Sequence, residues 1–466
     1  MMMKLFFRRI VLWCMVLCFL PLTAYGAVSI SEASVREGVI PTPYPEELQI
    51  SIIYEEWTHE NGLSCEVAVP VTCREDVNAQ LRQAQKAIFD DALTRANENS
   101  VLEIRATYRI SGQSWAGFLL TGRVLEMSKS SDVGYKIETA TYLCQDILTF
   151  DMATGAKLTL KDVFPEESEA WEQVRETVGN TMTGYYPNLP HDEAYMAQVK
   201  ADLSALSFMP CAGRLVISLP MWRIVPDKLQ LCNINLMYPD YRRWMTEEAQ
   251  LQTDNSHRPM ICLTYDDGPD RVQTHTLLRN LDTYGASATF FVLGKSISRF
   301  PELGRRELDR MHTVGSHTYE HTYAFHMTVS EMKMDRALCQ ETHLEYLGIA
   351  PEIFRAPGGS YQRYMENGVG WPLIMWNNSC GDTGENTMNQ LARHVITIAD
   401  DGDFILLHDI KEKTVKGTAI FLESLTQEGF LFATVDEVMY LHGIKLQPDH
   451  VYTSVFSPVV VPPEAE

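Results

Sequence analysis

The sequence predicts a mixed α/β protein, in which an α+β domain rich in antiparallel strands precedes a domain of alternating strands and helices. Over residues 45–245, apolar and polar side chains mostly alternate with the period of a half-buried sheet. Over residues 260–442, short apolar runs are separated by helical patterns, which is typical of a parallel sheet covered by helices. The chain has 466 residues, of which 45% are hydrophobic, so it is long enough to bury two cores.

Residues 1–26 have the layout of a secretory signal peptide. Three basic residues precede an almost wholly apolar run at 10–22, and small residues around Ala24 offer a cleavage point. An uncleaved membrane anchor is the alternative, although this run is short for a span. Because no later segment reaches the roughly 18 apolar residues of a membrane helix, we expect an exported protein whose mature chain has no membrane span.

Charge and cysteine spacing exclude some functions. The formal net charge is −22, so phosphate would repel the protein and nucleic acid is not an expected partner. None of the eight cysteines beyond the leader has the C-x-x-C spacing of a zinc or redox motif. These cysteines could form disulfides or be free thiols in the core, and the sequence leaves both alternatives open.

In the first domain, strands are expected at 48–54 and 101–110, where the alternation has a period of two. Residues 147–160 are expected to form a hairpin. Helical patterns at 75–97 and 167–183 interrupt the strands. Together these elements indicate an α+β domain built on antiparallel sheet.

Residues 246–259 are polar and without periodicity, which predicts a linker, and residues 443–466 are expected to form an extended tail. Between them, seven apolar runs are expected to be strands: 260–265, 288–293, 313–316, 353–356, 373–376, 404–407 and 430–434. Helical patterns lie between most of these runs, including 329–347 and 387–399. Seven strands in about 180 residues suit an irregular barrel or a doubly wound sheet.

Polar side chains follow four of these runs, at the point where each expected strand ends. They are Asp266 and Asp267, then His317 and His321, then Arg355, and finally His408. Because the carboxyl ends of parallel strands share one edge, where α/β enzymes carry their active sites, we expect these side chains to meet.

Asp267, His317 and His321 form a coherent set of metal ligands. The H-x-x-x-H spacing can place both imidazoles on one face of a helical turn. Three N/O ligands leave positions open for water and substrate, as in catalytic zinc sites. Two histidines and a carboxylate also describe a non-haem iron triad. Since such triads usually lie on antiparallel jelly-roll barrels, zinc hydrolysis fits this alternating domain better.

With Asp267 assigned to the metal, Asp266 is the candidate base. Arg355 could pair with Asp266 and hold it ionised. His408 follows a buried apolar run and can supply the proton that a departing amine needs. A base, a metal and an acid are the groups that amide hydrolysis requires.

These motifs resemble the polysaccharide deacetylases, the NodB-like group also called carbohydrate esterase family 4. Thr264-Tyr-Asp-Asp-Gly-Pro269 resembles the family's T-F-D-D-G-P, in which the first Asp is the base and the second binds metal. Ser316-His-Thr-Tyr-Glu-His321 resembles its S-H-T-x-x-H metal motif. Phe-Arg-Ala-Pro-Gly at 354–358 is similar to R-x-P-Y, and Leu-Leu-His at 406–408 to L-x-H with the acid histidine. The resemblance implies an irregular (β/α)7 barrel.

Two positions depart from the family's pattern. Gly358 replaces the Tyr of R-x-P-Y, whose backbone N–H holds the oxyanion, and glycine retains that N–H. In the D-x-x-D-W motif, Asp382 matches the second Asp, which would orient His408. The first Asp is missing, and Thr383 stands in place of the Trp that shapes the sugar pocket. The resemblance therefore implies intact catalytic machinery with altered sugar recognition.

The resemblance implies a secreted or envelope-associated enzyme that removes acetyl groups from an N-acetylated polysaccharide, above all peptidoglycan, and releases acetate. Zn²⁺ is the expected cofactor, with Co²⁺ or another divalent ion as alternatives. An O-deacetylase acting on acetylxylan or another glycan is one alternative function. A non-catalytic glycan-binding protein is another. The N-terminal domain resembles, more weakly, a domain of unknown function that precedes secreted bacterial deacetylases.

Overall fold

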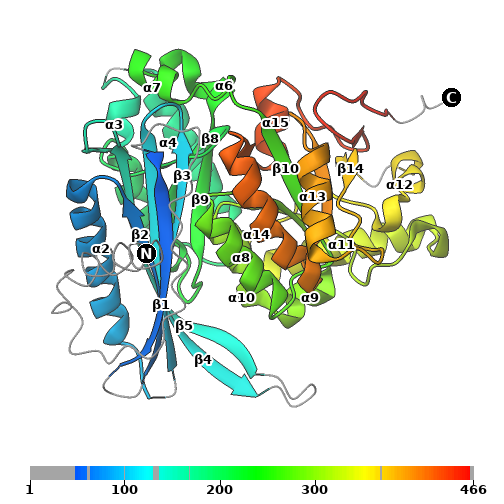
Figure 1. Ribbon diagram of the computed structural model, residues 1–466, viewed down its shortest axis with the longest axis horizontal. Coiled ribbons are helices and arrows are strands. Elements are labelled where there is room, and N and C mark those ends of the chain that lie inside the picture. The colour runs from blue at the N-terminus through cyan, green and yellow to red at the C-terminus, as the bar shows by residue number, and fades with distance from the viewer. Residues whose placement is uncertain are drawn as a thin grey trace, which may run out of the picture.

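The predicted mixed α/β class is confirmed by the computed structural model. It describes residues 48–59, 63–98, 100–129, 136–166, 168–367 and 370–461. A sheet-rich N-terminal part lies beside a part built of parallel strands and helices (Figure 1). The predicted signal peptide lies outside the described residues. Within the described ranges, no helix is long and apolar enough to cross a membrane.

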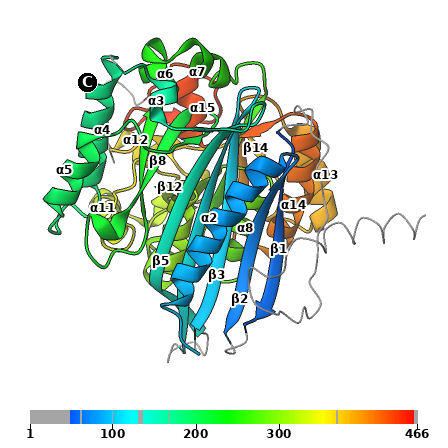
Figure 2. The same cartoon turned by 90° about the vertical axis from the view of Figure 1, so that its left-hand side faces the viewer.

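The N-terminal sheet has six strands in the order of the chain. They are β1 (Ile50–Thr58), β2 (Ser64–Thr72), β3 (Ser100–Ser111), β4 (Trp115–Lys129), β5 (Lys136–Asp151) and β6 (Ala156–Leu158). Neighbours are antiparallel except β2 and β3, which helix α2 (Glu75–Leu93) connects and which therefore run parallel. Helix α2 lies across one face of the sheet (Figure 2). The predicted hairpin is confirmed as β5 and β6.

A smaller layer completes the N-terminal part. Its elements are α3 (Leu160–Val163), α4 (Ala170–Gly184), α5 (Glu193–Ala201), β7 (Met209–Pro210), β8 (Arg214–Pro220), η3 (Met221–Arg223), β9 (Leu231–Met237), α6 (Tyr238–Tyr241), η4 (Arg242–Trp244) and α7 (Glu247–Gln252). Helix α7 falls in the expected linker, and this segment is packed. The buried Gln252 side chain accepts hydrogen bonds from the backbone N–H groups of Gln113 and Ser114. A polar side chain of the segment that was predicted to be a linker therefore forms buried hydrogen bonds.

The second part is built on parallel strands. Its main sheet has the order β12 (Thr313–Ser316), β11 (Thr289–Val292), β10 (Met260–Asp266), β15 (Phe404–His408) and β14 (Asn378–Ser379), and β16 (Leu431–Phe432) pairs with the start of β10. Single bridges continue from Ser316 through Phe354 to Leu373 in β13 (Leu373–Ile374). The predicted run at 353–356 thus forms only a bridge, and closure into a seven-stranded barrel stays a prediction.

Helices cover the parallel strands. They are α8 (Gln273–Thr283), α9 (Gly294–Arg299), α10 (Pro301–Asp309), η5 (Ala324–His326), α11 (Val329–Tyr346), η6 (Pro357–Gly359), α12 (Gln362–Glu366), α13 (Met388–Ile398), α14 (Glu412–Gln427) and α15 (Val435–Leu441). The two predicted helices are confirmed as α11 and α13, and each begins with a capping box. The expected tail contains β17 (Val451–Tyr452), which pairs with β13, so most of it belongs to the fold.

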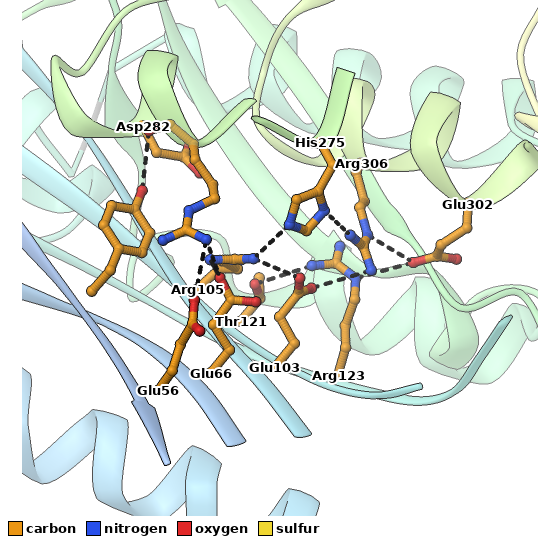
Figure 3. Close-up of polar contacts among 12 residues, drawn as sticks. Glu56, Glu66, Glu103, Arg105, Thr121, Arg123, His275, Asp282, Glu302 and Arg306 are labelled. Carbon is orange, nitrogen blue, oxygen red and sulfur yellow. Dashed lines mark hydrogen bonds and ion pairs between the residues drawn. The ribbon is translucent and has the colours of Figure 1, made fainter. Parts of the chain in front are cut away.

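The two parts share a buried interface, and this corrects one expectation about the first sheet. The polar residues of β3 were expected on the solvent face of a half-buried strand. They are Glu103, Arg105, Thr107 and Arg109, and all four are at most 3% exposed. They are buried because α8 and α10 of the second part cover this face (Figure 3). A hydrophobic core also runs through both parts, from Ile50 to Cys262 and beyond.

Ion pairs cross this interface. Arg123 on β4 pairs with Asp309 on α10 at 2.5 Å and lies 3.4 Å from Glu302 on the same helix. Glu103 lies 3.3 Å from Arg306, also on α10. Removing one partner of such a pair leaves a buried, uncompensated charge. The interface therefore depends on charges supplied by both parts.

Replacing Arg123 by Met should lower the free energy of unfolding by about 3–5 kcal/mol, because Asp309 would stay buried without its cation. The matched control is Lys86→Met. Lys86 pairs with Asp90 on the exposed surface of α2, where such a pair contributes only about 0.2–1 kcal/mol. Urea denaturation of both variants at one pH makes the comparison. Equal losses would show that the Arg123 pair does not hold the interface.

Candidate active site

The polar strand ends meet at one edge of the parallel sheet. Asp266 is the last residue of β10, and His408 is the last residue of β15. These two residues are direct partners in the register of the two strands. His317 follows β12, and Arg355 follows the bridge at Phe354. The predicted clustering of these side chains is therefore present.

Arg355 fixes the position of Asp266. Its guanidinium is fully buried, and Nη1 donates to Asp266 Oδ1 at 2.9 Å and to Thr264 Oγ1 at 2.8 Å. Nε and Nη2 donate to the carbonyls of Ile374 and Met375, both in or beside β13. Each donor group thus has a partner, and the carboxylate of Asp266 faces a fixed positive charge.

Asp267, His317 and His321 lie within coordinating reach of one another. Asp267 Oδ1 is 3.7 Å from His317 Nε2 and 3.4 Å from His321 Nε2. That oxygen is buried and accepts no hydrogen bond. His317 Nδ1 is 2.8 Å from the Arg355 carbonyl, and donation there leaves the Nε2 lone pair facing the carboxylate. A buried carboxylate oxygen facing two imidazoles, without any donor, fits a divalent cation.

The expectation that a helical turn carries both histidines is wrong. Residues 317–321 form a loop, in which Thr318 and His321 have φ angles of +69° and +64°. The two imidazole centroids are still only 5.1 Å apart. The first residues of α9 form hydrogen bonds to this loop. The backbone N–H groups of Gly294 and Lys295 donate to the backbone carbonyls of Thr318 and Tyr319. These hydrogen bonds stabilise the loop conformation of residues 317–321 in place of a helical turn.

His408 is bound to a buried carboxylate. Its Nδ1 lies 2.9 Å from Asp382 Oδ1, and its backbone N–H donates to Asp382 Oδ2 at 3.0 Å. Burial opposes the protonated form of His408, but the hydrogen bond to Asp382 outweighs it and raises the pKa of the imidazole. Burial likewise opposes ionisation of Asp382, yet the bonds from His408 and Thr414 leave its pKa lowered. The pair therefore favours an imidazolium beside a carboxylate.

A second group of possible metal ligands lies in the interface and does not suit a cation. Glu66, Glu103 and His275 offer ligand atoms close to one another. Guanidinium groups already neutralise both carboxylates: Arg105 and Arg279 lie 2.8 Å from Glu66, and Arg105 lies 2.9 Å from Glu103 (Figure 3). Burial and the neighbouring arginines lower the pKa of His275 to about 3, so the ring stays neutral. Of the two groups found among the described residues, the one at the strand edge has a carboxylate, Asp267, that no lysine or arginine neutralises there.

Sequence reasoning places Asp409 at a strand end but gives it no role, and the structure shows that it shapes the turn after β10. It is fully buried and accepts a hydrogen bond from the Thr274 hydroxyl. Burial raises the pKa of Asp409 to about 7. A Cβ on Gly268 would lie only 2.1 Å from Asp409 Oδ2, so this position requires glycine. The only signal in the sequence is that Asp409 directly follows His408.

Sequence reasoning also missed two aromatic residues that border the site. A Cβ on Gly358 would lie 2.3 Å from Tyr323 Cε1, and a Cβ on Gly359 would lie 3.3 Å from Trp376 Cη2. Both glycines have positive φ angles. The rings therefore fill the space that side chains at these two positions would take. No local pattern pairs Tyr323 with Gly358, because 34 residues and helix α11 separate them.

Comparisons show which known proteins this chain resembles. A family model described as polysaccharide deacetylase matches residues 253–369, which include both aspartates, both histidines of the loop and Arg355. PgdA, a peptidoglycan-N-acetylglucosamine deacetylase of Listeria monocytogenes, is 25% identical over 399 residues, or 83% of this chain and 84% of the relative. An acetyl xylan esterase structure from Clostridium thermocellum is 28% identical and covers 42% of this chain and 100% of that chain, with a TM-score of 0.41.

A shorter relative is matched over almost its whole length. It is a peptidoglycan-N-acetylglucosamine deacetylase of Bacillus cereus, 32% identical over 196 residues. The match spans 40% of this chain and 92% of the relative, so nearly all of that protein is matched by this chain. Identity at this level over almost a whole relative shows that the chain belongs to the polysaccharide deacetylase family.

Proposed function

We propose that this protein is an exported, metal-dependent N-deacetylase that hydrolyses the acetamido groups of peptidoglycan N-acetyl sugars and releases acetate. Members of its family deacetylate polysaccharides, and proteins named as peptidoglycan deacetylases are among its relatives. One observation carries the proposal: Asp266 and His408 are partners on neighbouring strands, the first paired with Arg355 and the second with Asp382. The carboxylate base and the imidazolium acid therefore lie opposite one another at the ends of two adjacent strands.

Asp267, His317 and His321 would hold a divalent ion, which supplies a Lewis acid for the acetamide carbonyl and lowers the pKa of a bound water. Zn²⁺ is the ion we propose. Co²⁺ and other divalent ions remain alternatives, since imidazole and carboxylate ligands accept several first-row metals. The buried Asp267 oxygen without a hydrogen bond supports this assignment.

The protein's own groups complete the reaction. Asp266 accepts the proton of the attacking water, while Arg355 holds the carboxylate in place. The backbone N–H of Gly358 donates to the oxyanion of the tetrahedral intermediate. His408, oriented through Nδ1 by Asp382, donates its Nε2 proton to the departing amine. The C–N bond breaks, and the products are acetate and a free amino sugar.

The raised pKa of His408 supports an amide substrate over an ester. An amine must be protonated to depart, whereas the alkoxide of an activated ester leaves more readily without a proton. Hydrolysis of O-acetyl groups on xylan remains the rival within the family, and a non-catalytic glycan-binding protein is the rival outside it. Peptidoglycan lies outside the cytoplasmic membrane, so the leader pattern of residues 1–26 supports the same location.

A panel of purified glycans tests the substrate. We expect acetate release from peptidoglycan strands, weak release from N-acetylglucosamine dimers and trimers, and little from acetylxylan. The reason is that Thr383 replaces the Trp of the family's sugar pocket, so binding should depend on contacts with a longer chain. Acetate is measured by an enzyme-coupled assay. Preference for xylan would establish the O-deacetylase instead, and no release from any glycan would establish the binding protein.

Two substitutions separate the adjacent carboxylates. Asp266→Asn should keep the metal but lower kcat by about 10²–10⁴-fold, the usual scale of general acid–base catalysis. Asp267→Asn should reduce bound metal, measured by elemental analysis after dialysis. Glu320→Gln is the control, because Glu320 precedes His321 but its side chain is exposed and pairs with Lys295. Metal loss in Asp266→Asn with retention in Asp267→Asn would reverse the assignment.

The pH profile tests the acid. Asp382 raises the pKa of His408, so Asp382→Asn should lower that pKa. The protonated acid would then be lost at a lower pH, and the alkaline limb of kcat/KM on an N-acetylated oligomer should move downward. Lys411→Met should move this limb upward, because the Lys411 ammonium, 3.6 Å from Asp382, opposes protonation of His408. Shifts of the same sign in both variants would exclude His408 as the group that titrates.

A further inference from the structure

A row of aromatic side chains begins at a proposed metal ligand and runs outward. The Tyr323 ring meets His321 edge-on, with centroids 5.3 Å apart, and the Phe325 ring lies 5.4 Å beyond Tyr323. Tyr323 is 37% exposed and Phe325 is 62% exposed. Side chains of this size are usually buried when their role is to stabilise the fold. Their exposure beside the catalytic groups points to a ligand.

A third ring lies beside Arg355. Trp376 is half-buried and follows β13, whose carbonyls hold Arg355. The Arg355 guanidinium lies 5.6 Å from the centroid of the Trp376 ring. Trp376 also packs against Gly359, as Tyr323 packs against Gly358. An aromatic ring thus packs against Gly358, whose N–H is the proposed oxyanion donor, and another packs against the next residue, Gly359.

The chemistry of these rings matches a sugar. A pyranose ring presents C–H groups on its faces and hydroxyl groups around its rim. A fixed aromatic ring covers such an apolar face, and a tyrosine adds a hydroxyl for the rim. Within the described residues, the Tyr323 hydroxyl has no hydrogen-bond partner in the protein. It therefore remains available to a bound hydroxyl or acetamido group.

We propose that Tyr323, Phe325 and Trp376 form the glycan-binding surface of this enzyme and stack on sugar rings at and next to the acetamido group that is cleaved. This surface replaces the aromatic residue that is missing at position 383, where the chain has Thr383. Its rings come from two other segments, the loop after β12 and the end of β13. Tyr323 contacts the catalytic backbone, and Phe325 extends the surface toward the neighbouring sugar. This inference rests on the proposed function for the identity of its ligand.

Phe325 offers the cleanest test, because it is the most exposed ring and touches no proposed catalytic group. Its matched control is Phe456, which is 64% exposed and also contacts a histidine ring, His442, at 5.3 Å. Phe456 packs against Gly402, before the start of β15 and at the opposite end of that strand from His408. The variants to compare are Phe325→Ala and Phe456→Ala, with Tyr323→Phe and Tyr323→Ser as a second pair.

Two readouts separate binding from chemistry. The first is kcat/KM on N-acetylglucosamine oligomers of four or more units, divided by kcat/KM on a small aryl acetate that cannot cover the surface. Phe325→Ala should lower this ratio about tenfold, mainly through KM, and Phe456→Ala should not change it. The second is calorimetric binding of the same oligomers in the Asp266→Asn background. Tyr323→Ser should weaken binding more than Tyr323→Phe, because only the latter keeps the ring.

The outcomes distinguish the two proposals. Equal ratios and affinities for Phe325→Ala and Phe456→Ala would overturn the glycan-binding surface, even if acetate release by the unmodified protein upholds the deacetylase. Weaker oligomer binding by Phe325→Ala in a protein that releases no acetate would uphold the surface and overturn the deacetylase. Loss of binding in both phenylalanine variants would also overturn the surface, because Phe456 lies away from the site.

Discussion

The buried guanidinium of Arg355 is the interaction on which the site depends. Its side chain holds Asp266 and reaches two carbonyls of the β13 segment, while its own carbonyl lies 2.8 Å from His317 Nδ1. One residue thus connects the candidate base, a candidate metal ligand and the strand that leads to Trp376. Because the guanidinium is fully buried, any shift of these partners would leave it unpaired at considerable cost. The same residue therefore fixes geometry at three places, at two of them through its guanidinium and at His317 through its backbone carbonyl.

The sequence predicted the parts of the site that local patterns specify. Apolar runs located the ends of β10, β12 and β15, and parallel strands bring their carboxyl ends to one edge. The conformation after β12 could not be predicted in this way, because an i,i+4 spacing is the same in a helix and in a loop. The groups that decide it are the backbone N–H groups of α9, and nothing in residues 317–321 records them.

The face of β3 shows a second limit. Alternating polar residues on a strand look the same whether they meet water or a charged partner. Arg105 and Arg109 are buried because α8, α10 and the segment beside them arrive from about 170 to 200 positions further along the chain: Arg105 meets His275, and Arg109 donates to the Arg310 carbonyl. The sequence shows that charged residues are present on this strand, and only the tertiary structure shows that they are paired inside the protein.

The charged interface has a consequence for the order in which the chain is made. The six-stranded sheet is complete at residue 158, whereas Arg306 and Asp309 are translated about 150 residues later. If the sheet forms before α10 has been made, its face at β3 and β4 is exposed to the surroundings during that interval. An apolar face would invite aggregation during that interval. A face lined with glutamate and arginine stays hydrated until α10 emerges, and then exchanges its water for ion pairs that hold the two halves together.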